Sequence, residues 1–278
     1  WGRLVAAVAA ELGVDSGVSG DVTSTLPLGA GLSSSTSLVV ALAVALGALP
    51  TGEGTGAAEP SGAEALARTC RRVEAGASGV PCGIMDQLTI ACGVVGAALL
   101  IDCAAETVDP VELPEGLVVH AVHSGVRREL GATDYAQRRA ECERAEAIIG
   151  PLREASEDGV GAIDDPVVRR RARHVVTEIA RVEAAVAAAR AGDVAHLGKL
   201  MDDSHASLRD DFEVSTPGLD HLVENLRALP GVHGARLTGA GFGGCVVAVA
   251  DAEVPDESIG GWRLKPSGGA RLLVDPCS

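Results

Sequence analysis

Apolar and polar positions along the chain follow two periods, and these predict a mixed set of helices and strands. The segments predicted as helices are residues 1–13, 38–46, 61–74, 134–149, 166–191, 193–208 and 217–229. The segments predicted as strands are residues 18–26, 97–102, 117–124, 232–237 and 245–250. The order of these elements predicts an α+β fold with two lobes that divide near residue 115.

Capping residues and glycine-rich stretches set several of these boundaries. Ser61 followed by Glu64 forms a capping-box pattern, and Asp165 is the predicted N-cap of the helix that opens at Pro166. Residues 50–62 are rich in Gly, Glu and Thr without any periodicity, which predicts an exposed loop. A glycine-rich loop is also predicted over residues 76–83, directly before the peptide Ile84-Met85-Asp86-Gln87.

The stretch Pro27 to Ser37, Pro-Leu-Gly-Ala-Gly-Leu-Ser-Ser-Ser-Thr-Ser, precedes an apolar helical run. Glycines let the backbone turn tightly and approach a ligand, and a helix start offers free N–H groups that favour phosphate. No Gly-Lys-Ser/Thr follows, so this is not a Walker loop. The alternative is an ordinary glycine turn with a serine N-cap, and the residues alone leave both interpretations open.

A second glycine loop, Thr238 to Gly244, resembles the dinucleotide-binding pattern G-x-G-x-x-G. A strand rather than a helix is predicted to follow it, which argues against a dinucleotide site. A loop of this kind lets another backbone come very close, for instance the first glycine loop.

Three side chains are candidates for chemistry. Asp86 is predicted in a short loop, where its carboxylate could orient an alcohol and accept its proton during phosphoryl transfer. Glu74 falls in the last turn of its predicted helix, where a bound Mg²⁺ would offset its unfavourable interaction with the helix dipole. Tyr135, the single tyrosine, could lay its ring against a sugar. The alternatives are a surface aspartate, a solvated glutamate and ordinary tyrosine packing.

Composition excludes some partners. The 278 residues carry a net charge of −15, which argues against a nucleic-acid or anionic membrane surface. Seven scattered cysteines without a Cys-x-x-Cys pair are typical of reduced thiols in the cytoplasm. No apolar run approaches the ~20 residues that span a bilayer. An anionic nucleotide would therefore need local dipoles, a metal and a few arginines.

Several blocks, taken together and in order, resemble the galactokinases, within the kinase superfamily named for galactokinase, homoserine, mevalonate and phosphomevalonate kinases. Pro27 to Ser37 is similar to the superfamily's nucleotide-phosphate motif, and Cys82 to Gln87 is the peptide most specific to galactokinases. The other matching blocks are residues 98–103, 126–130, Tyr135 with 138–142, 205–211 and 236–245.

The resemblance implies a monomer with two lobes that phosphorylates the anomeric hydroxyl of galactose with ATP and Mg²⁺. Residues 1–115 would form a lobe like ribosomal protein S5 domain 2, and residues 116–278 a ferredoxin-like lobe. Asp86 would be the catalytic carboxylate, Gly83, Asp86 and Tyr135 would contact the sugar, and Ser34 and Glu74 would hold the metal. The residues implied to bind the phosphates are Pro27, Gly29, Ala30, Gly31, Leu32, Ser33, Ser34 and Ser35.

The family's first motif, Arg-x-Asn-x-x-Gly-Glu-His-x-Asp-Tyr, should precede Trp1. It supplies an arginine partner for the catalytic aspartate and several sugar ligands, so these residues alone are expected to have weak or no activity. A version that carries the motif is expected to phosphorylate galactose. The alternatives are a non-catalytic sugar or nucleotide sensor, or a related kinase for N-acetylgalactosamine, mevalonate or homoserine. The intact serines 33–35 favour an enzyme, and residues 82–87 favour galactose.

Overall fold

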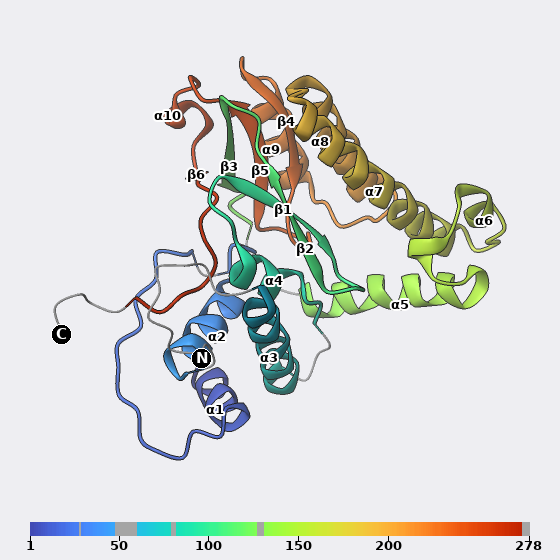
Figure 1. Cartoon of the computed structure of the whole chain (residues 1–278). Helices are drawn as coiled ribbons and strands as arrows, with labels where there is room; N and C mark the ends of the chain where they lie inside the picture. The colour runs from blue at the N-terminus through green and yellow to red at the C-terminus, as the bar shows by residue number, and fades with distance from the viewer. Residues whose placement is uncertain (28, 48–59, 79–81, 127–130, 274–278) are drawn as a thin grey trace. The chain divides into compact units, whose positions relative to one another are not determined.

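The computed structural model describes residues 1–27, 29–47, 60–78, 82–126 and 131–273, and its fold is α+β, as predicted (Figure 1). The chain divides into two compact units. The first unit comprises Trp1–Pro27, Ser33–Glu112 and Lys265–Ser278, and the second unit comprises Leu28–Leu32 and Leu113–Leu264. Within the described residues, no helix is long and apolar enough to cross a membrane.

In the described part of the chain, helices and one hairpin form the first unit. They are α1 (Gly2–Glu11), α2 (Ser34–Ala45), α3 (Pro60–Ser78), α4 (Met85–Cys92), β1 (Ala97–Asp102) and β2 (Thr107–Glu112). The core lies between the helices, because α2 is apolar around most of its circumference and packs Val39 and Val40 against Leu66 of α3 and Leu88 of α4. This packing fixes the start of α2 and the start of α4 in one rigid cluster.

The chain returns to the first unit after residue 264. The amide of Gly269 donates to the carbonyl oxygen of Gly93 at 2.7 Å, and the amide of Ala270 donates to the carbonyl oxygen of Ile90 at 2.9 Å. A Cβ atom on Gly269 would lie 2.1 Å from the carbonyl oxygen of Ala91, so only glycine permits this approach. We call residues 265–270 the return segment; it ties down the C-terminal end of α4.

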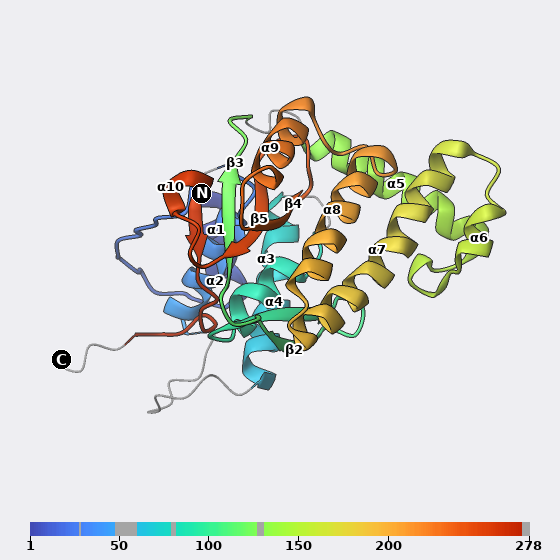
Figure 2. The same ribbon diagram turned by 90° about the horizontal axis from the view of Figure 1, so that it is seen from above.

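The second unit is built on a four-stranded antiparallel sheet of order β4-β5-β3-β6. Its elements are β3 (Leu117–His123), α5 (Gly131–Ile149), the 3₁₀ turn η1 (Leu152–Glu154), α6 (Glu157–Gly161), α7 (Pro166–Ala191), α8 (Val194–Asp210), α9 (Pro217–Arg227), β4 (Val232–Leu237), β5 (Cys245–Asp251), α10 (Asp256–Ile259) and β6 (Trp262–Leu264). Apolar residues of α8 and α9 cover one face of the sheet, and Figure 2 shows these helices beside β4 and β5.

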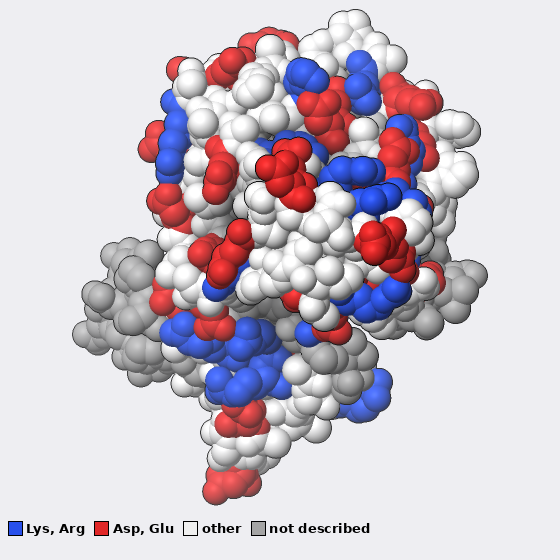
Figure 3. Space-filling view, turned by 90° about the vertical axis from the view of Figure 1, so that its right-hand side faces the viewer, with Lys and Arg blue, Asp and Glu red and all other residues white. Residues whose placement is uncertain are grey.

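Ion pairs are frequent on the surface of the second unit. Acidic and basic side chains lie interspersed over the upper part of the face shown in Figure 3. Arg171 and its partner Glu141 are both buried. Arg171 donates to Glu141 at 2.7 Å, to Glu213 at 2.6 Å and to the carbonyl oxygen of Asp211 at 2.5 Å. Burial opposes the charge of Glu141, but the hydrogen bond from Arg171 holds the pKa of Glu141 below its usual value. The cluster joins α5, α7 and the segment after α8.

Some predicted elements are wrong. Residues 18–26 form no strand, because in the described residues they pair with no other strand, and Val18 is 63% exposed. Ser61 is not an N-cap, since α3 already begins at Pro60, and the helix continues past Glu74 to Ser78. Of the predicted loop at 50–62, residues 48–59 lie outside the described part of the chain.

Candidate functional site

Three side chains from three helices meet in the first unit. The hydroxyl of Thr36 in α2 donates to Oε1 of Glu74 in α3 at 3.1 Å, and Nε2 of Gln87 in α4 donates to Oε2 of Glu74 at 2.5 Å. Thr36 is 4% exposed and Gln87 2% exposed, whereas Glu74 is partly exposed. We call these three residues the Glu74 clamp. An ionised carboxylate has about four lone-pair positions, so these two hydrogen bonds leave capacity for a cation.

Asp86 lies in the first turn of α4 rather than in a loop, as the sequence had predicted. The reason is that residues 85–92 bury Leu88 and Ala91 against the core at helical spacing. The first turn of a helix is a favourable position for a carboxylate, because negative charge is stabilised at a helix N-terminus by ~0.3–1 kcal/mol. Asp86 is partly exposed, and among the described residues it has no hydrogen-bond or ion-pair partner.

Cys82 shows that Glu74 and Asp86 act on the same small region. Burial raises the pKa of the Cys82 thiol, the charges of Glu74 and Asp86 raise it further, and Arg71 opposes them. The thiol also lies 3.7 Å from the carbonyl oxygen of Arg71. The next residue, Gly83, is exposed. Both predicted carboxylates therefore lie near the peptide that begins at Cys82.

The backbone φ angle alternates in sign along the first glycine loop. Gly29 and Gly31 have φ of 74° and 76°, and Ser33 is left-handed at φ 54°, ψ 37°. Alternation of this kind aims successive N–H groups to one side, as in anion-binding nests. Ser33 is the N-cap residue of α2 but makes no side-chain capping hydrogen bond. Ser33 thus caps α2 by position alone, and no hydrogen bond from its side chain occupies the first N–H groups of the helix.

The serine hydroxyls are placed at the start of α2. Ser34 and Ser35 occupy its first two positions, and no hydrogen bond joins them to Glu74 in the described part of the chain. The hydroxyl that reaches Glu74 belongs to Thr36, which sequence reasoning missed together with Gln87. The signal was present in their position, since Thr36 directly follows the serine run and Gln87 directly follows Asp86.

The second glycine loop joins β4 to β5, and the described residues that approach it most closely belong to the second unit itself. A Cβ on Gly241 would lie 2.3 Å from the carbonyl oxygen of Val214, and one on Gly243 would lie 2.8 Å from that of Val126. The loop amides of Phe242 and Gly244 donate to the same two carbonyl oxygens. The expected close approach of a backbone is confirmed.

Tyr135 lies in α5 of the second unit and is 40% exposed, a value that agrees with half-buried packing as well as with a sugar contact. One turn later, Arg138 donates to the carbonyl oxygens of Phe212 and Glu213 at 2.7 and 3.0 Å. The guanidinium also lies 5.8 Å from the ring centre of Phe242 in the second glycine loop. Arg138 therefore connects α5 to that loop.

Metal chemistry at the site depends on few protein ligands. Within the described residues, no three His, Cys, Asp or Glu side chains form a cluster that could hold a metal by themselves. Mg²⁺ does not require one, because it is commonly bound by one or two carboxylates together with substrate phosphates and water. Glu74, with its spare lone pairs and its position beside the start of α2, fits that mode of binding.

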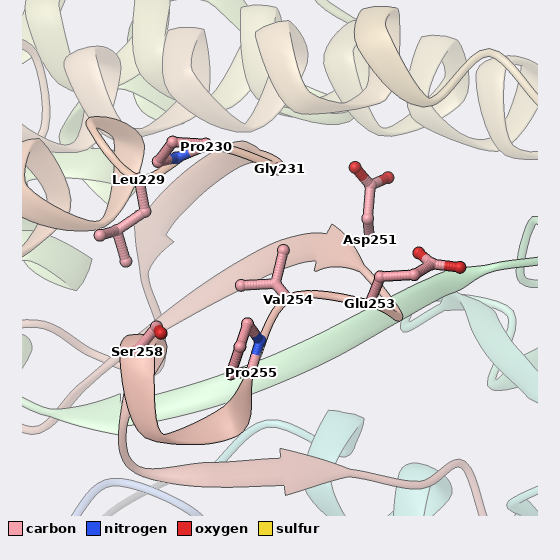
Figure 4. Close-up of a pocket in the computed structure, with 8 residues that line it drawn as sticks. All are labelled: Leu229, Pro230, Gly231, Asp251, Glu253, Val254, Pro255 and Ser258. Atoms are coloured by element: carbon pink, nitrogen blue, oxygen red, sulfur yellow. The ribbon is translucent and has the colours of Figure 1, made fainter.

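A cavity of about 500 Å³ lies elsewhere in the second unit (Figure 4). Its lining residues are Leu229, Pro230, Gly231, Asp251, Glu253, Val254, Pro255 and Ser258. None of them is a predicted site residue, so this cavity does not define the site.

Two family models match the chain: GHMP kinases N terminal domain over residues 2–94, and GHMP kinases C terminal over residues 185–260. The chain is 47% identical to the galactokinase of Bos taurus over 242 residues, covering 85% of this chain and 60% of that protein. It is 42% identical to the galactokinase of Chloroflexus aggregans over 267 residues, covering 91% and 67%. The chain belongs to the galactokinase family of GHMP kinases.

A solved structure agrees with this family. The crystal structure of Lactococcus lactis galactokinase complexed with galactose has a TM-score of 0.82 and 30% sequence identity, and the match covers 98% of this chain and 76% of that one. The GHMP kinase fold implied by the sequence motifs is confirmed. The chain spans about 60% of the length of the Bos taurus galactokinase that it matches.

Proposed function

We propose that the protein is a galactokinase, which transfers the γ-phosphoryl group of ATP to the anomeric hydroxyl of galactose. The observation that carries the proposal is the pair of hydrogen bonds that join Glu74 to Thr36, in the first turn of α2, and to Gln87, the residue that follows Asp86 in α4. Family membership supports it, as does the galactose in the Lactococcus lactis relative.

In this proposal each residue has a definite task. The backbone N–H groups of residues 29–35 bind the nucleotide phosphates. Asp86 orients the anomeric hydroxyl and takes its proton, while the sugar oxygen bonds to the γ-phosphorus and the bond to ADP breaks. Gly83 and Tyr135 contact the sugar. Mg²⁺, held by Glu74 and a serine hydroxyl such as that of Ser34, would neutralise charge on the phosphates.

The test is ADP release from the protein expressed from its gene, with any in-frame coding sequence upstream of Trp1. The acceptors are galactose, N-acetylgalactosamine, glucose and mevalonate. We expect release with galactose, and a fall in kcat of ~10²–10⁴-fold for Asp86→Asn. Asp21→Asn, at an exposed aspartate outside any helix or strand, serves as the control.

The other outcomes discriminate between the alternatives. Release with another acceptor and not with galactose would assign the protein to a different kinase of the superfamily. Nucleotide binding without release on any acceptor would identify a sensor. One observation supports the sensor: Asp86 has no positively charged partner in the described residues.

We also propose a reducing compartment, the cytoplasm, as the place of action. Cys70, Cys82, Cys92, Cys103 and Cys142 are free thiols. Burial and the nearby Glu74 raise the pKa of Cys70 to about 12, so this thiol is not reactive at neutral pH. Unpaired cysteines of this kind are typical of cytosolic proteins.

A further inference from the structure

We infer that Thr36 and Gln87 are positioning residues that hold the Glu74 carboxylate in the orientation in which it binds the metal of the nucleotide. The inference rests on the proposed function and adds to it two residues with no part in the nucleotide, sugar or metal contacts proposed above. It concerns the first unit alone, because all three side chains belong to its helices.

Thr36 and Gln87 bind the two oxygens of the Glu74 carboxylate from two sides. Thr36 donates to Oε1 and Gln87 donates to Oε2, and each donor is itself almost fully buried. A buried donor in a packed core has few alternative rotamers, so the two donors hold the Glu74 side chain and the plane of its carboxylate in one orientation. Groups that orient a metal ligand in this way commonly change metal affinity by 10–100-fold when removed.

Gln87 also carries a side-chain oxygen that is unpaired among the described residues. Oε1 of Gln87 is buried and has no hydrogen-bond partner in the described residues. A buried acceptor without a donor is rare in folded proteins, so we expect a group that binds there to supply the donor. Mg²⁺ usually keeps several of its water ligands. In our inference, one such water donates to Oε1, so Gln87 acts on the carboxylate with one end of its amide and on the ion's hydration shell with the other.

Thr36 and Gln87 are each adjacent along the chain to a proposed site residue. Thr36 follows Ser35 of the phosphate loop, and Gln87 follows Asp86. Successive helical residues point about 100° apart, so in each pair the first side chain is more exposed than its buried neighbour. The Glu74 clamp therefore joins the start of α2, which follows the phosphate loop, to the start of α4, which carries Asp86.

The experiment compares wild type with Thr36→Val, Thr36→Ser and Gln87→Met. Thr36→Val and Gln87→Met keep side-chain size but remove hydrogen bonding, and Thr36→Ser restores the hydroxyl. Gln137→Met is the matched control, because Gln137 also donates to a glutamate, Glu141, at 2.9 Å, but does so in the second unit. The first measurement is the affinity of each protein for a non-hydrolysable ATP analogue in the presence of a metal chelator. The second is the Mn²⁺ concentration needed to strengthen that binding, with bound Mn²⁺ followed by electron paramagnetic resonance.

We expect unchanged affinity in chelator for all variants. Gln87→Met should need at least about tenfold more Mn²⁺ than wild type, and more than Thr36→Val, since it removes the acceptor as well as the donor. Thr36→Ser and Gln137→Met should behave as wild type. Equal Mn²⁺ dependence in all proteins would overturn the positioning role while nucleotide binding stands. If Mn²⁺ does not change nucleotide binding by the wild-type protein, both the Glu74 clamp and the metal role of Glu74 are overturned. If the wild-type protein binds no nucleotide, the proposed function and this inference are overturned together.

Discussion

The buried His174 of α7 makes the stability of the second unit depend on pH. Its ring is 6% exposed, accepts or donates one hydrogen bond with Ser207 at 2.9 Å, and stacks on Phe212 with ring centroids 4.4 Å apart. Burial, opposed by the charge of Glu178 and assisted by those of Arg181 and Arg236, lowers the pKa of His174 to about 4. The folded protein therefore keeps this ring neutral under conditions in which a solvated histidine is charged.

The size of the effect follows from the two pKa values, 6.5 for the unfolded chain and about 4 for the folded protein. Between them the unfolded state binds more protons, so stability rises with pH, and this contribution is complete above the unfolded value. Lowering the pH from about 7.5 to about 5 should cost about 2 kcal/mol of unfolding free energy through this group. Complete loss, reached near the folded pKa and below it, is ~3 kcal/mol.

The assay is urea unfolding followed by circular dichroism at both pH values. Burial also lowers the pKa of His120 and of His205, so both add to the wild-type slope, and the comparison with His174→Gln isolates one residue. The variant should lose about 2 kcal/mol less than wild type on acidification. His196→Gln, at an exposed position in α8, is the control. Equal losses in wild type and His174→Gln would refute the reasoning.

Three further substitutions have expected outcomes. Arg171→Met removes the Arg171 partner of the buried Glu141 carboxylate and should lower the unfolding free energy by ~3–5 kcal/mol in urea titrations. The control Arg153→Met removes an exposed ion pair and should cost less than about 1 kcal/mol. Gly241→Ala places a Cβ 2.3 Å from a carbonyl oxygen at φ +78°, and a melting temperature equal to wild type would contradict the close approach. Gly269→Ala should release the return segment, seen as faster hydrogen exchange at the amide of Ala270, whereas Gly17→Ala, with nothing near its Cβ, should not.

Helices with local start and stop signals could be predicted from the sequence. The predicted helix 166–191 matches α7 because Asp165 caps it by accepting from the amides of Val167 and Val168, and Gly192 ends it in the left-handed region at φ 69°. These signals lie within a few residues of each helix end.

Strands were harder to predict because their signals are not local. The hairpin partner β2 was missed because it contains Asp109 and Pro110, which are rare in strands, and it forms only by pairing with β1. The three residues of β6 carry no pattern of their own and form by pairing with β3. Conversely, residues 18–26 have strand composition but no partner in the described chain.

The candidate site divides in the same way. Glu74 and Asp86 could be selected from the sequence as chemical groups, because each is a carboxylate at a helix end or beside a glycine-rich stretch. The hydrogen bonds of Glu74 to Thr36 and Gln87 could not, since they join positions 38 and 13 residues apart through helix packing. The predicted site residues stay predictions until the assays above are done.

The return segment has a consequence for how the protein is made. Vectorial synthesis delivers α1 to α4 to the ribosome exit long before residues 265–270, yet Ile90 and Gly93 bond to that late segment. The second unit, apart from the short stretch Leu28–Leu32, is contiguous along the chain and can finish first. The first unit thus completes its packing only after residues 265–270 have been synthesised. Nascent chains stalled before residue 265 should expose the end of α4 to chaperones and proteases.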